Sequence, residues 1–116
     1  KTRYAADYSR WLSDIGNAVC TDGESVRDLA ARVWQAVQRI TDENDGKTVL
    51  ITTHATPIRS LQCRLQGLPL CEMHTVPWVT NASVTVATAE NGVFTLNAIS
   101  LDAHLADSRT ALPNTV

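Results

Sequence analysis

A histidine stands at residue 54, where an apolar run gives way to a helix signal. Residues 48–53 form an uncharged run rich in β-branched side chains, which is typical of a strand buried on both faces of a sheet. Thr56 is a suitable N-cap and Pro57 suits the first helical turn, so we expect a helix to begin just after His54. A histidine that faces the free N–H groups of a helix is placed to bind an anion such as phosphate. The alternative is a structural histidine that only satisfies a turn carbonyl.

The other histidines do not suggest a metal site. His54, His74 and His104 are far apart in the sequence and lie in dissimilar contexts, so we expect no metal and place His74 in a loop against Trp78. The sequence contains no Walker loop, dinucleotide-binding glycine pattern, serine-hydrolase elbow or HExxH motif. Its acidic residues are scattered, which gives no support to a paired-carboxylate hydrolase.

The three cysteines, Cys20, Cys63 and Cys71, cannot all pair within the chain and follow no zinc-binding spacing. A cysteine nucleophile is not favoured, because Cys63 falls inside an expected helix. Cysteines that stay unpaired are typical of a reducing compartment, so we expect a cytoplasmic protein.

Composition narrows the remaining function classes. The 116 residues are enough for one small domain, and 44% hydrophobic with 19% charged residues is ordinary for a globular protein. The net charge of -2 gives no electrostatic case for binding nucleic acid, and no apolar run approaches a membrane span. The first residue is Lys1, from which we expect a piece of something longer.

Two helices are predicted before His54. Apolar residues at three- and four-residue spacing predict a helix over residues 4–15, lying on the surface of a core. A longer helix should start at Ser25, which forms a capping box with Asp28. Its charged residues fall mostly off the apolar stripe and should be solvated. That stripe consists of Val26, Leu29, Ala30, Val33, Val37 and Ile40.

After His54 the pattern changes from helix to hairpin. We expect a helix over residues 57–65, then an irregular stretch, then strands over residues 81–88 and 93–100 joined at Asn91-Gly92. Residues 107–116 lack periodicity and should form a loose tail. Only residues 48–53 resemble a buried strand, which needs parallel neighbours. We therefore expect part of a larger α/β sheet, whose missing strands come from elsewhere.

The segment Thr52-Thr53-His54-Ala55-Thr56-Pro57-Ile58-Arg59 resembles the second-histidine motif of the histidine phosphatase superfamily, the phosphoglycerate-mutase-like proteins. Further segments resemble the family in the same order, from Gly23 to Leu105. They are the Gly23-Glu24-Ser25 that opens a long helix, the helix end at residues 61–67, the strand opening Asn81-Ala82-Ser83-Val84-Thr85, and the terminal His104-Leu105.

The resemblance implies an α/β fold. Residues 1–106 would be the carboxyl-terminal portion of one domain, part of a three-layer α/β/α sheet that is mostly parallel and has a carboxyl-terminal hairpin. The family's nucleophilic histidine lies in an R-H-G motif, which does not occur here. Its partner arginines and acidic proton donor also precede the G-E-S helix, so only the carboxyl-terminal half is represented. Ala55 replaces the family's usual glycine but keeps the N–H that would face phosphate.

The function implied by the resemblance is phosphoryl transfer without a cofactor. It would be hydrolysis of a phosphorylated small molecule through a phosphohistidine, or a mutase reaction, with His54 catalytic and His54, Ala55 and Thr56 binding phosphate. The T-P-I sequence is similar to phosphatase domains fused behind ribonuclease H in some bacterial proteins. Without a nucleophile we expect the chain alone to be inactive. The alternative is an inactive assembly module of the same fold, and a homodimer formed by strand exchange fits either reading.

Overall fold

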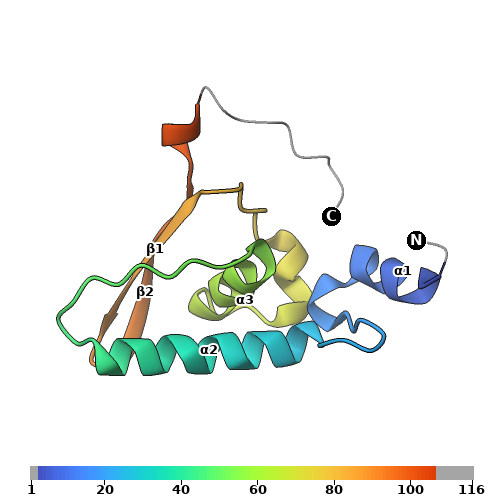
Figure 1. The fold of residues 1–116 in the computed structure, drawn as a ribbon, viewed down its shortest axis with the longest axis horizontal. Helices are drawn as coiled ribbons and strands as arrows, with labels where there is room; N and C mark the ends of the chain where they lie inside the picture. The colour runs from blue at the N-terminus through green and yellow to red at the C-terminus, as the bar shows by residue number, and fades with distance from the viewer. Residues whose placement is uncertain (1–2, 107–116) are drawn as a thin grey trace.

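The computed structural model describes residues 3–106, so the predicted tail at residues 107–116 lies outside the described part. Figure 1 shows α2 running along one side, with α3 and a hairpin beside it. In the described range no helix is both long enough and apolar enough to cross a membrane. The mixed helix and strand composition confirms the coarse α/β prediction. The elements are α1 (Ala5–Ser13), α2 (Val26–Glu43), α3 (Ala55–Leu65), β1 (Val84–Glu90) and β2 (Val93–Leu101), with 3₁₀ turns at Ile15–Asn17, Leu70–Thr75 and Ala103–Leu105.

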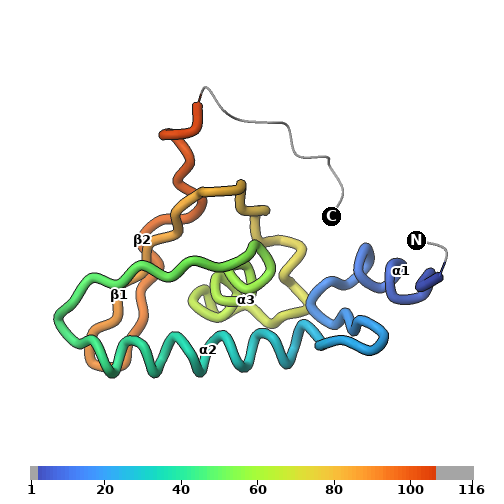
Figure 2. Tube along the Cα trace, in the orientation of Figure 1, coloured from blue at the N-terminus to red at the C-terminus, as the bar shows by residue number. Residues whose placement is uncertain are grey.

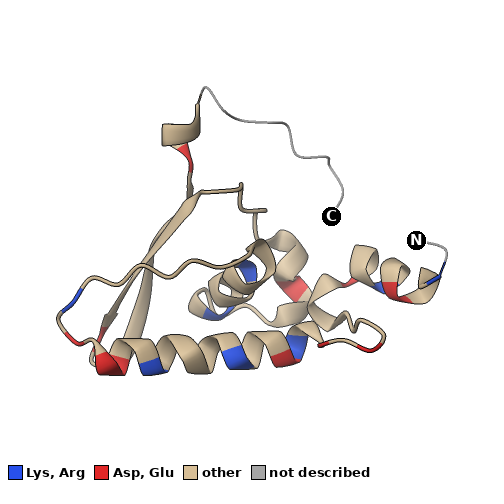
Figure 3. Cartoon of the chain, viewed as in Figure 1, with Lys and Arg blue, Asp and Glu red and all other residues tan. Residues whose placement is uncertain are grey.

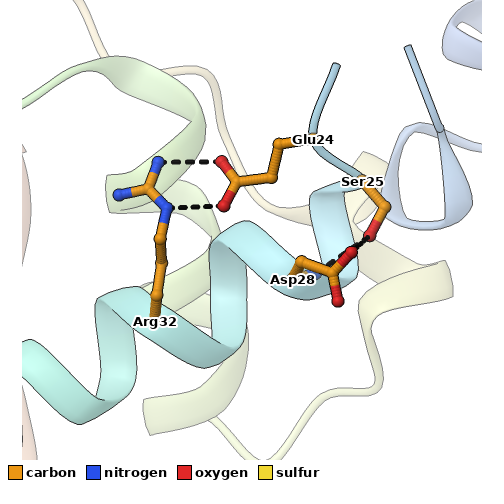
Figure 4. A network of polar contacts seen from close by, with 4 residues as sticks. All are labelled: Glu24, Ser25, Asp28 and Arg32. Atoms are coloured by element: carbon orange, nitrogen blue, oxygen red, sulfur yellow. Dashed lines mark hydrogen bonds and ion pairs between the residues drawn. The ribbon is translucent and has the colours of Figure 1, made fainter. Parts of the chain in front are cut away.

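The start of α2 follows its predicted capping signal. The Ser25 hydroxyl oxygen accepts the backbone N–H of Asp28 at 3.0 Å and donates to the Asp28 carboxylate at 2.6 Å (Figure 4). Arg32 forms two bonds to the Glu24 carboxylate, at 2.6 and 2.8 Å, and these hold the pKa of Glu24 below its usual value. Charges of both signs follow the exposed side of α2, as predicted (Figure 3).

The first helix is shorter than its periodicity predicts. It ends at Ser13, because Asp14 caps a separate 3₁₀ turn by accepting the backbone N–H of Asn17 at 3.3 Å. No residue of α1 is buried, whereas Ile15 in the 3₁₀ turn belongs to the core. The helix therefore lies on the surface, as expected.

The core lies where the Ile15–Asn17 turn, the start of α2, α3 and the Leu70–Thr75 turn meet. Trp11 and Leu68 pack against it from the side. Most of the α2 stripe is only half-buried, because little of the described chain covers it. The buried cluster consists of Ile15, Ala18, Val26, Cys63, Met73 and Val76.

The predicted strand over residues 48–53 is wrong as an element of secondary structure. These residues are extended between α2 and α3 but pair with no strand (Figure 2). A strand needs a hydrogen-bonded neighbour, and β1 and β2 pair only with each other among the described residues. The apolar run is consequently exposed, with Leu50 82% accessible to solvent and Val49 and Ile51 nearly half accessible. A large parallel sheet is thus absent from the part of the chain that the structure describes.

The predicted hairpin is confirmed. Asn91 and Gly92 both have positive φ, at 52° and 78°, which is the backbone of a tight type I′ turn. β1 starts at Val84, three residues later than predicted, because residues 81 and 82 form a turn in which Ala82 has a φ of 58°. Phe94 of β2 packs on Trp34 of α2 with ring centroids 4.8 Å apart, so the hairpin leans on the helices.

Candidate functional site

His54 lies at the point where the exposed, extended segment meets α3. It occupies the N-cap position with a φ of -102° and a ψ of 168°, and its carbonyl accepts the N–H of Ile58 at 3.2 Å. The prediction of Thr56 as N-cap was therefore two residues late. Pro57 still falls in the first turn, where a missing N–H costs nothing. The side chain of His54 is exposed and free to meet a ligand.

The amino end of α3 offers donors without competing acceptors. No side chain caps the helix, and its first turn carries no acidic residue. The N–H groups of Ala55 and Thr56 have no acceptor within the helix, since they precede the first intrahelical bond. Together with the positive end of the helix dipole, these donors favour an anion. The structure thus brings the three predicted site residues into one turn.

Arg59 adds a second feature that sequence reasoning assigned no role. Its side chain is 2% accessible, and its Nη2 donates to the carbonyls of Met73 and Val76 at 2.8 and 3.1 Å. Its Nε and Nη1 are buried without a hydrogen-bond partner. Burial lowers the pKa of this guanidinium. Its guanidinium carbon lies 4.8 Å from the ring centroid of Trp78, so Arg59 is stacked on that ring.

The other predicted candidates lie apart from His54 and are engaged elsewhere. His74 lies in the Leu70–Thr75 turn, with Nδ1 3.0 Å from the carbonyl of Cys71. His104 lies after β2, with Nε2 3.0 Å from the carbonyl of Ala82. Among residues 3–106 no three histidine, cysteine or acidic side chains are grouped as metal ligands.

The cysteines in this part of the chain are free thiols, and Cys63 is the buried one. Burial raises its pKa, which opposes the thiolate form that a nucleophile needs. The sequence around Arg59 gave no signal of its burial, because the apolar stripe of α3 is Ile58, Leu61 and Leu65, and Arg59 falls off it. Its acceptors lie 14 and 17 residues further on, so the pattern near Arg59 did not reveal them.

Comparison with known sequences identifies a family. Residues 1–102 match the sequence model of the Histidine phosphatase superfamily (branch 1). The match starts at the first residue, so it includes the amino-terminal helix, which the motif comparison from Gly23 to Leu105 left out. Phosphoserine phosphatase 1 of Hydrogenobacter thermophilus is 24% identical over 105 residues, covering 90% of this chain and 49% of that protein. Adenosylcobalamin/alpha-ribazole phosphatase of Escherichia coli is 29% identical over 65 residues, covering 56% of this chain and 32% of that protein.

Solved structures agree on the fold. Bacillus stearothermophilus YhfR superposes with a TM-score of 0.81 at 26% identity, covering 87% of this chain and 50% of that one. A mutant phosphoserine phosphatase from Entamoeba histolytica, solved in complex with phosphoserine, has a TM-score of 0.72 at 19% identity and covers 85% and 50%. The chain therefore spans about half the length of these proteins, or less.

Proposed function

The chain belongs to the histidine phosphatase superfamily, and from this premise we propose that it takes part in the hydrolysis of a phosphomonoester of a small molecule. The observation that carries the proposal is His54 at the uncapped amino end of α3, in a first turn without acidic residues. Phosphate would bind between the His54 imidazole and the N–H groups of Ala55 and Thr56. Two similar proteins, phosphoserine phosphatase 1 and adenosylcobalamin/alpha-ribazole phosphatase, are phosphatases by name and support the same reaction class.

The proposed chemistry divides one displacement into two. A neutral histidine attacks phosphorus, the bond from phosphorus to the ester oxygen breaks, and the leaving oxygen takes a proton from an acid. Water then attacks the phosphohistidine and releases phosphate. His54 and the helix N–H groups would stabilise the charge on the equatorial oxygens in both steps. This scheme uses no cofactor, and a mutase would differ only in the acceptor of the phosphoryl group.

We propose further that the chain corresponds to the carboxyl-terminal half of the domain. The missing R-H-G motif and the half-length coverage of the relatives support this. Residues 48–53 would then be a strand of a three-layer, mostly parallel sheet whose other strands lie in polypeptide outside this sequence. Their exposed apolar side chains fit that role. A second copy of the chain is an alternative source of a pairing edge, through strand exchange.

The competing proposal is an inactive assembly module of the same fold. The exposed segment at residues 48–53 favours it, because an unpaired apolar edge invites association whether or not chemistry follows. A fusion behind ribonuclease H and a cytoplasmic location remain proposals that rest on the T-P-I sequence and on the unpaired cysteines.

Titration of the ¹⁵N-labelled chain with inorganic phosphate, followed by NMR, tests the site. We expect amide shifts centred on His54, Ala55 and Thr56, with weak affinity because few charged donors converge there. His74 and His104 are internal controls, and a His54→Ala variant should lose the response. Shifts spread evenly over the three histidines, or no shifts, would return His54 to a structural role.

Activity is tested separately with p-nitrophenyl phosphate. Loss of a covalent nucleophile removes the intermediate altogether, so the chain alone should show no turnover. Turnover by the chain that disappears in His54→Ala would show that the missing-half proposal is wrong. Turnover that appears only when the upstream half of the reading frame is coexpressed would support it.

A further inference from the structure

The loop at residues 77–83, between the Leu70–Thr75 turn and β1, is fastened to α3 at both ends. Before the loop, the Val76 carbonyl accepts Nη2 of Arg59 at 3.1 Å. After it, the hydroxyl oxygen of Thr85 accepts Nε2 of Gln62 at 3.2 Å. Arg59 and Gln62 are both buried residues of α3. The loop therefore has a fixed position against the helix that begins beside His54.

The interior of the loop is also held. The Thr80 hydroxyl donates to the Asp102 carboxylate at 3.1 Å, and Nε2 of His104 lies 3.0 Å from the carbonyl of Ala82. Because a carbonyl can only accept, His104 must donate in this contact. Ala82 keeps a φ of 58°, an unfavourable backbone conformation for a residue other than glycine, which these bonds help to maintain. Such a loop presents its side chains in one arrangement.

Trp78 is the large apolar side chain that this loop leaves exposed to solvent. Val76 and Val79 on either side are almost completely buried, whereas Trp78 remains 37% accessible. The Arg59 guanidinium lies over its ring at 4.8 Å, which fixes the indole. A rigid, half-open indole costs little conformational entropy when it binds a ligand.

Arg59, on which this indole stacks, lies in the second turn of α3, near the end that begins after His54. Side chains of a helix tilt toward its amino terminus, and by this rule the Arg59 side chain extends along the axis of α3 in the direction of His54. The two Cα atoms are five residues apart, about 7.5 Å along the helix axis. A phenyl ester of a phosphate bound at His54 would extend over a comparable length, whereas a methyl ester would not.

We propose that Trp78 is a specificity-determining residue, which packs against the organic group of the phosphomonoester and favours esters of planar aromatic groups. The inference rests on the proposed function, since it requires phosphate to bind at His54. It goes further in naming the substrate class and the residue that selects it.

NMR titrations of the ¹⁵N-labelled chain with phenyl phosphate and methyl phosphate test the inference. Both esters should shift the amides of Ala55 and Thr56, and phenyl phosphate should bind about two- to tenfold more tightly, as expected for one aromatic pair. Only phenyl phosphate should shift the indole N–H of Trp78 through its ring current. Trp34 is a matched control in the same spectrum, because it also stacks on an arginine, Arg64, at 4.7 Å.

Variants separate the possible outcomes. Trp78→Leu keeps an apolar side chain and should make the two esters bind equally, while Trp78→Phe should keep part of the preference. Equal binding by the unmodified chain, or a Trp78 indole that phenyl phosphate does not shift, overturns the inference and leaves the His54 site standing. If neither ester shifts Ala55 or Thr56, the proposed site and the inference both fail. The indole readout needs no variant, so a misfolded Trp78→Leu does not prevent a decision.

Discussion

Gly16 is the position where one added methyl group should do the most damage. A Cβ atom built there would lie 1.7 Å from the backbone oxygen of Leu70 and 2.9 Å from the backbone nitrogen of Cys71. The glycine is buried in the Ile15–Asn17 turn, where that turn packs on Leu70–Thr75. The obstacle is backbone, so no side-chain rotation can relieve the overlap.

The displacement required sets the magnitude. Moving the Leu70 oxygen from 1.7 Å to an ordinary contact of 3.4 Å separates the two turns by about 1.7 Å. Ile15 of one turn and Met73 of the other belong to the same buried cluster, and the separation would loosen their packing in it. Overpacking a core costs about 1–3 kcal/mol, and a clash with backbone belongs at the upper end. We therefore expect Gly16→Ala to lower the free energy of unfolding by about 3 kcal/mol.

Urea denaturation followed by far-UV circular dichroism measures this change. The matched control is Gly23→Ala in an exposed loop, where the new Cβ would lie 3.1 Å from the Cys20 Cβ and 3.5 Å from the Cys20 backbone oxygen, without the severe overlap found at Gly16. That control should stay within about 0.5 kcal/mol of the unmodified chain. A Gly16→Ala variant as stable as Gly23→Ala would refute the close packing of the two turns.

Three further outcomes are expected. Arg59→Ala should lower the free energy of unfolding by about 3 kcal/mol in urea denaturation, since it removes the donor to the Val76 carbonyl, leaves the Met73 carbonyl with only the Val76 N–H, and opens a cavity; a loss below about 1 kcal/mol would contradict this. Glu24 has a folded-state pKa below the ordinary 4.5, so its contribution to stability is present above pH 4.5 and is lost as pH falls through the lowered pKa. In Glu24→Gln this part of the pH dependence should vanish, which urea midpoints measured at successive pH values would show. Leu50→Asp should reduce self-association, measured by light scattering, and hydrophobic-dye binding, while changing the free energy of unfolding by less than about 0.5 kcal/mol. Unchanged scattering and dye binding would show that the exposed segment does not cause association.

Local signals in the sequence were sufficient where the deciding partners are a few residues apart. Ser25 and Asp28 are three residues apart, and their capping bonds are present. The turn at Asn91-Gly92 depends on the backbone preferences of those two residues, and the hairpin follows. The start of a helix beside His54 was predicted within two residues for the same reason.

The features that the sequence did not predict depend on contacts between residues that are far apart in the chain. Whether residues 48–53 form a strand depends on neighbours, and the described residues provide none. The buried state of Arg59 depends on the carbonyls of Met73, in the Leu70–Thr75 turn, and of Val76, just after it, and no local pattern encodes them. The sequence analysis placed His74 against Trp78 and gave Arg59 no part there, whereas the fold brings the Arg59 guanidinium over that ring.

The exposure of residues 48–53 also bears on aggregation of the chain. The segment is six residues long, rich in β-branched side chains, and free of charge, proline and glycine. That composition is typical of segments that stack in register into cross-β fibrils with dry steric-zipper interfaces. Lys47 is the one charged residue that directly borders the segment, and it acts as a gatekeeper at that end only. While residues 48–53 stay exposed, pairing between copies of this segment is therefore a route to fibril formation, and any contact that covers the segment would oppose it.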